Sequence, residues 1–94
     1  MIRLNAFFET KEGVTAQQVT DATADLISKS QQEEGCRSYD LFQSTTRPSV
    51  YVFCETWANQ EALDRHAASA HFTAALPRIE ALAKEALYID KFEK

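Results

Sequence analysis

The sequence has few of the residues that break regular structure or build special sites. Its 94 residues include only two glycines, two prolines and two cysteines. Such a composition excludes a collagen-like or low-complexity chain, and the length allows one domain with a single core, over residues 1–94. Cys36 and Cys54 form no Cys-x-x-Cys pattern. We therefore expect buried, reduced thiols and neither a redox pair nor a zinc site.

Positive charge and long apolar runs are scarce as well. Ten Lys and Arg against fourteen Asp and Glu give a net charge of -4, and the basic residues are scattered. Nucleic acid is not an expected partner, because affinity for its backbone requires clustered cations. No apolar run approaches the roughly 18 residues of a membrane-spanning helix, and the first residues do not resemble a secretory signal. We expect no membrane association and a cytoplasmic location.

The sequence does contain short periodic segments. Apolar, aromatic and β-branched residues predict four strands, over residues 2–10, 36–44, 50–57 and 86–92. The Thr15-x-x-Gln18 capping box predicts a helix that ends near Gly35. Asn59 and Ser69 are typical N-caps, and they predict a helix over residues 60–67 and another that begins at residue 71.

The order of these elements predicts the fold. A β-α-β-β-α-β succession is typical of the ferredoxin-like α+β fold, with an antiparallel sheet and the helices on one face. Each strand also carries apolar residues toward the other face. Because an exposed apolar sheet face is costly, we expect a homodimer in which a second copy covers it.

The strand over residues 50–57 carries the first candidate site residue. Alternation places Tyr51, Phe53, Glu55 and Trp57 on one side. Glu55 is unusual, because a carboxylate among aromatics is expensive to bury unless it is hydrogen-bonded or paired. It is either a structural acceptor or a functional group that accepts a proton or orients an imidazole.

His66 and His71 are candidate bases near the break between the two short helices. They are not spaced as i, i+4 residues, and no third ligand accompanies them at a suitable spacing, so we predict no metal. An imidazole at the rim of a pocket could take a proton from a phenol or an enolisable carbonyl. The alternative is a pair of capping or surface histidines.

Aromatic and polar residues elsewhere suggest the walls of a pocket. Trp57 and Phe72 could stack against a flat ring, and Tyr39 and Asn5 could supply hydrogen bonds at its edge, although large aromatics also simply fill cores. The sequence contains no glycine-rich phosphate loop and no Gly-x-Ser-x-Gly elbow, which disfavours nucleotide cofactors and covalent hydrolysis.

Two stretches, EEGCRSYDLFQS and YVFCETWANQEALDRHAASAHF, resemble the antibiotic biosynthesis monooxygenase superfamily, particularly its small quinol-monooxygenase-like members. The resemblance covers essentially the whole chain. Its motifs are Gly-Cys-x-x-Tyr, Glu-x-Trp and His-x-x-x-x-His-[Phe/Tyr]. They map to Gly35, Cys36, Tyr39, Glu55, Trp57, His66, His71 and Phe72.

The resemblance implies a homodimer whose sheets pack into an α/β barrel. It also implies an enzyme that oxidises a small quinol or related aromatic with molecular oxygen, without metal, flavin or haem. In that interpretation His66 or His71 is the base and Glu55 orients it or serves as an anchor. Trp57, Phe72, Tyr39 and Asn5 bind the substrate.

Two alternatives stay open at this point. Some relatives isomerise small phosphorylated carbonyl compounds by proton transfer, and the five arginines of the chain leave room for a phosphate-binding pocket. A dimer that binds a small ligand without catalysis is the other alternative.

Overall fold

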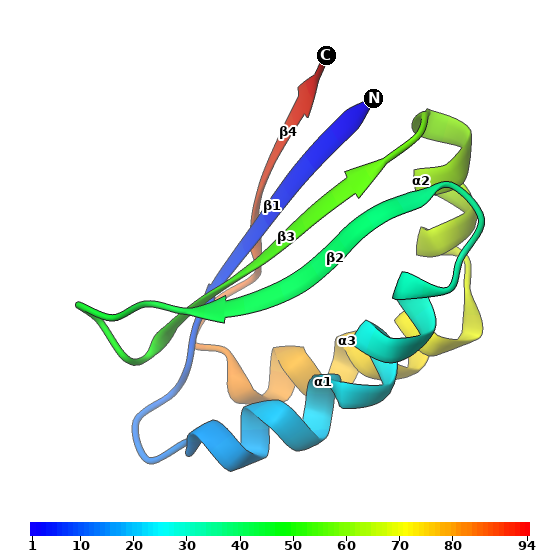
Figure 1. Ribbon diagram of the computed structural model, residues 1–94. Helices are drawn as coiled ribbons and strands as arrows, with labels where there is room; N and C mark the ends of the chain where they lie inside the picture. Colours follow the sequence, from blue (N-terminus) through cyan, green and yellow to red (C-terminus); the bar gives the residue numbers. More distant parts are fainter.

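Four antiparallel strands form a sheet that is covered on one face by three helices (Figure 1). The computed structural model describes residues 1–94. The elements are β1 (Ile2–Glu9), α1 (Ala16–Gln31), β2 (Cys36–Gln43), β3 (Val50–Trp57), α2 (Gln60–Ala67), α3 (Ala70–Leu82) and β4 (Tyr88–Glu93). The predicted ferredoxin-like order is confirmed, and the last strand begins two residues later than its sequence pattern suggests.

The sheet places residues from distant parts of the sequence side by side. Its strands lie in the order β2-β3-β1-β4, so β1 and β3 occupy the centre. Glu55 of β3 is paired with Leu4 on β1 and with Tyr39 on β2. The Glu55 side chain therefore projects from the middle of the sheet, on the face that the helices cover.

The helices begin where capping side chains satisfy free backbone N–H groups. The predicted capping box of Thr15 and Gln18 is present at the start of α1. The side chains of Asn59 and Ser69 accept hydrogen bonds from backbone N–H groups at the starts of α2 and α3. Each cap stabilises its helix by roughly 1 kcal/mol. None of the three helices is long and apolar enough to cross a membrane.

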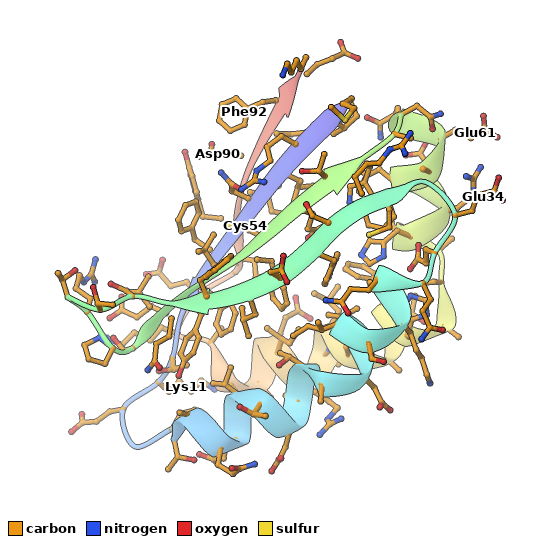
Figure 2. All side chains as sticks on the ribbon, viewed as in Figure 1. Lys11, Glu34, Cys54, Glu61, Asp90 and Phe92 are labelled. Carbon is orange, nitrogen blue, oxygen red and sulfur yellow. The ribbon has the colours of Figure 1, made fainter.

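The two faces of the sheet differ in exposure. Alternate residues of β1 and β3 that face the helices are buried, while their neighbours on the open face are half-buried or exposed. Phe42, Val52, Phe7 and Tyr88 form an apolar row across the open face. Figure 2 shows Cys54, Asp90 and Phe92 on this side, away from α1 and α3.

The two thiols are free but only half-buried. The prediction that both thiols are buried is therefore wrong. Cys54 belongs to the open sheet face, where no helix covers it. Burial raises the pKa of the Cys36 thiol above its ordinary value, which keeps this thiol protonated and unreactive.

Candidate functional site

A cavity of about 490 Å³ lies between the helix-covered face of the sheet and the helices α2 and α3. Most of its lining side chains are hydrophobic, including Leu4, Phe53 and Phe72. Glu55 and His66 are among the few titratable groups that reach it. Its size and its apolar lining with a few polar groups are those of a small-molecule site.

The His66 ring is held rigidly at the wall of this cavity. Its side chain comes from α2 and is almost fully buried. The rings of Trp57, Phe72 and Tyr39 pack around it, with centroid separations of 4.7, 5.1 and 5.2 Å respectively. Its Nδ1 atom lies 2.9 Å from Glu33 Oε1. Packing and this hydrogen bond together fix the direction in which the imidazole points.

The hydrogen bond to Glu33 determines which nitrogen of His66 is free. A carboxylate only accepts hydrogen bonds, so Nδ1 carries the proton and Nε2 retains its lone pair. The Nε2 atom is buried and has no hydrogen-bond partner in the protein. Burial lowers the pKa of His66 below its ordinary value, and Glu33 opposes this effect only in part. At neutral pH the cavity therefore contains an unprotonated, unpartnered base.

His71 does not line this cavity. It is half-buried, and its side chain lines a separate surface hollow between α1 and α3. Its Nε2 atom contacts the same Glu33 oxygen that holds His66. Of the two candidate bases only His66 thus lines the cavity, while His71 contacts the Glu33 carboxylate as well.

Glu33 is the site residue that sequence reasoning missed. It lies between α1 and β2, where Gly35 adopts a φ of 86° and so lets the chain reverse. A Cβ atom on residue 35 would lie 2.6 Å from the Ala62 side chain, so α2 packs directly against this glycine. This close approach brings Glu33 beside His66. In the sequence, the feature that could have pointed to Glu33 was its position in the EEGC segment.

Glu33 also changes the argument about metals. Donor atoms of Glu33, His66 and His71 all lie within 4.8 Å of one another. The expectation that no third ligand accompanies the histidines is therefore wrong, because two imidazoles and one carboxylate are a suitable donor set for a transition metal. Hydrogen bonds between Glu33 and both imidazole rings also explain why these three side chains lie together.

Glu55 occupies a different environment from Glu33. Only 5% of its surface is exposed, and it forms no ion pair. Trp57 Nε1 donates a hydrogen bond of 2.9 Å to its Oε1 atom. Burial raises the pKa of Glu55 to about 7, although the hydrogen bond from Trp57 acts in the opposite direction. Glu55 forms no hydrogen bond to either histidine, so of its two predicted roles the orienting of an imidazole is wrong, and Glu33 holds both rings instead.

The remaining predicted residues divide between the cavity and other places. Tyr39 and Phe72 line the cavity. Trp57 is fully buried and does not line it, but it packs against His66 and holds Glu55. Asn5 lies on the open face of the sheet, where Arg3 Nε donates to its side chain. The prediction that Asn5 belongs to the pocket is therefore wrong.

Cationic groups are almost absent from the cavity. None of the five arginines lines it, and Lys91 is the only lysine that does. Its Nζ atom donates a hydrogen bond to Gln60 at 3.0 Å. A phosphate group would find no arginine here, which weakens the case for a phosphorylated substrate.

The fold is ferredoxin-like, and a buried imidazole lies at the wall of an apolar cavity whose size is typical of small-molecule sites. Comparison with known proteins then gives its family. The family model for antibiotic biosynthesis monooxygenase matches residues 1–78. The chain therefore belongs to the antibiotic biosynthesis monooxygenase family.

Individual relatives agree with this membership. YcnE of Bacillus subtilis, named a monooxygenase on provisional grounds, is 32% identical over 72 residues, which are 77% of this chain and 75% of YcnE. A crystal structure of an antibiotic biosynthesis monooxygenase is 31% identical, with a TM-score of 0.91, and the match covers 100% of this chain and 98% of that one. A Bacteroides thetaiotaomicron protein of unknown function, described as a possible oxidoreductase, is 40% identical with a TM-score of 0.88, over 99% and 96% of the two chains.

Proposed function

We propose that this protein is a cofactor-independent monooxygenase that oxidises a small phenol or quinol with molecular oxygen. The observation that carries the proposal is His66, whose side chain is part of the wall of an apolar cavity and whose Nε2 atom is buried and unpartnered. Family membership supports an oxygenase, and the cavity has room for one small aromatic ring system.

The chemistry requires only a base, a dry site and a reactive substrate. His66 Nε2 removes the phenolic proton, and the Glu33 carboxylate at Nδ1 stabilises the imidazolium that forms. The electron-rich phenolate passes one electron to oxygen, and the resulting radicals combine at a ring carbon. The apolar side chains around the ring exclude water and strengthen the electrostatic pairing of phenolate with imidazolium.

We also infer that two copies of the chain associate through their open sheet faces. Phe42 and Tyr88 on this face are 54% and 65% exposed, and Phe7 and Val52 lie between them. A contiguous apolar row of this kind is costly in water. A second copy related by a two-fold axis buries the same row on both chains.

Oxygen uptake with 1-naphthol, hydroquinone and catechol tests the proposed reaction. We expect consumption by the wild-type protein and a loss of at least about 100-fold in His66→Gln, the size of effect typical of a general base. His71→Gln is the matched control, because it makes the same change outside the cavity and should cost much less. Equal rates for the wild-type protein and His66→Gln would remove the proposed base.

A second candidate is an isomerase that moves a proton within a small carbonyl compound. The specific observation in its favour is that one cavity holds a buried carboxyl group and a buried imidazole, Glu55 and His66. Solvent-deuterium incorporation into such a compound, without oxygen uptake, would favour this candidate. Binding of a naphthol with neither oxygen uptake nor deuterium incorporation would instead indicate a ligand-binding protein without catalytic activity.

A further inference from the structure

Glu55 lies in an almost entirely apolar environment. Leu4 and Tyr39 flank it on the neighbouring strands, and Phe53 and Trp57 flank it along β3 on the same face. The hydrogen bond from Trp57 to Oε1 is the only one that its side chain forms, so Oε2 has no partner within the chain. No lysine, arginine or histidine pairs with it.

These surroundings favour the protonated form of the carboxyl group. A carboxylate without a cation is expensive to bury, and taking up a proton removes that cost. Trp57 supplies one hydrogen bond, which a neutral carboxyl oxygen can also accept. The nearby Glu33 carboxylate disfavours a second negative charge, and the raised pKa of Glu55 agrees with this.

The cavity therefore holds two groups in complementary states. His66 has a free lone pair, and the surroundings of Glu55 favour the form of its carboxyl group that carries a proton. Pairs of titratable groups whose environments separate their proton affinities are the usual arrangement of acid and base in one active site. The base accounts for the first step of the proposed reaction but not for the fate of the peroxide that follows.

We propose that Glu55 is the acid–base residue of the second half of the oxygenation, which converts the ring-bound peroxide into a quinone and water. This proposal rests on the proposed oxygenase function. It requires a phenol with a hydrogen on the carbon that oxygen attacks, such as the carbon para to the hydroxyl of 1-naphthol.

The proton transfers balance without any further reactant. The acid form of Glu55 gives its proton to the peroxide anion and produces a hydroperoxide. The Glu55 carboxylate then removes the hydrogen from the same carbon, the C–H electron pair forms the new C=O bond, and the O–O bond breaks. The departing hydroxide takes the proton that His66 holds and leaves as water. Naphthol and oxygen thus give a quinone and water, and both residues return to their starting states.

Glu55→Gln separates this second half from the first. Glutamine retains the shape and can still accept the hydrogen bond from Trp57, but it cannot act as an acid. We expect oxygen uptake to continue with 1-naphthol while quinone formation, followed by absorbance, falls about 100-fold. Organic hydroperoxide, followed by iodometry, should accumulate in its place. Glu12→Gln, an exposed change in the turn before α1, is the matched control and should behave as the wild-type protein does.

Quinone formation at the wild-type rate by Glu55→Gln would overturn the proposal. An infrared measurement tests the acid independently of activity: at neutral pH the carbonyl band of a protonated carboxyl group should be present in the wild-type protein and in Glu12→Gln, and absent in Glu55→Gln. Absence of this band from the wild-type protein would also overturn the proposal. Failure of the wild-type protein to consume oxygen with any phenol would instead contradict the proposed function, which is a separate result.

Discussion

Replacing Glu55 by glutamine should change how the stability of the protein depends on pH. Burial raises the pKa of this carboxyl group from 4.5 to about 7. Between these values the folded protein holds a proton that the unfolded chain has lost, so the free energy of unfolding falls as pH rises. Below pH 4.5 both states are protonated and the effect is absent. Above pH 7 the full cost of the buried charge is present.

The size of the effect follows from the pKa difference. Each pKa unit corresponds to about 1.4 kcal/mol, so this group should remove about 3 kcal/mol of stability between pH 4.5 and pH 8. Small domains are stable by only about 5–15 kcal/mol. Glutamine has a similar shape and no charge, so the Glu55→Gln protein should not lose this stability. Between pH 4.5 and pH 8 its free energy of unfolding should therefore rise by about 3 kcal/mol relative to that of the wild-type protein.

Urea unfolding of both proteins at pH 4.5, 6 and 8 measures this difference directly. Other groups also titrate over this range; the lowered pKa of His66, for example, makes stability rise with pH in the acid range. These groups are common to both proteins, so their effects cancel in the comparison. A stability difference that stays constant with pH, or that shifts toward the wild-type protein in alkali, would refute the view that Glu55 is buried as an acid.

Three further predictions concern the support of the site and the open face. Gly35→Ala should destabilise the fold by about 2 kcal/mol more than Gly13→Ala in urea unfolding, because both positions have positive φ but only residue 35 meets the α2 side chain. Glu33→Gln should lower oxygen uptake about 100-fold and should change which ring nitrogen of His66 carries the proton, as measured by nitrogen NMR. An unchanged tautomer of His66 would contradict the orienting role of Glu33. Tyr88→Asp should convert a dimer into a monomer in sedimentation experiments, while Thr20→Asp on α1 should not, and equal masses for both would contradict the dimer interface.

Local patterns were sufficient to predict most of the fold. Capping residues such as Thr15, Asn59 and Ser69 act within one helical turn, so their effect can be read from adjacent residues. Strand alternation likewise placed Glu55 on the buried face together with Trp57. The same alternation puts Asn5 on the opposite side from Leu4, and a consistent use of it would have excluded Asn5 from the pocket.

The site depends on contacts that local patterns do not contain. Glu33 and His66 are separated by 33 residues and meet where α2 packs against Gly35. His66 and His71 look equivalent in the sequence, yet the break before α3 directs one ring into the cavity and the other toward a surface hollow. Which carboxylate orients which imidazole is therefore a property of the packed helices.

Isotope labelling tests the central claim, that His66 acting as a base allows this protein to oxygenate a phenol unaided. Protein treated with a chelator and dialysed would receive 1-naphthol under ¹⁸O₂, and mass spectrometry would count the labelled oxygen atoms in the quinone. We predict one labelled atom in each quinone molecule formed by the wild-type protein, and no product above background from His66→Gln. Unlabelled quinone, or labelled quinone formed equally well by His66→Gln, would contradict the account.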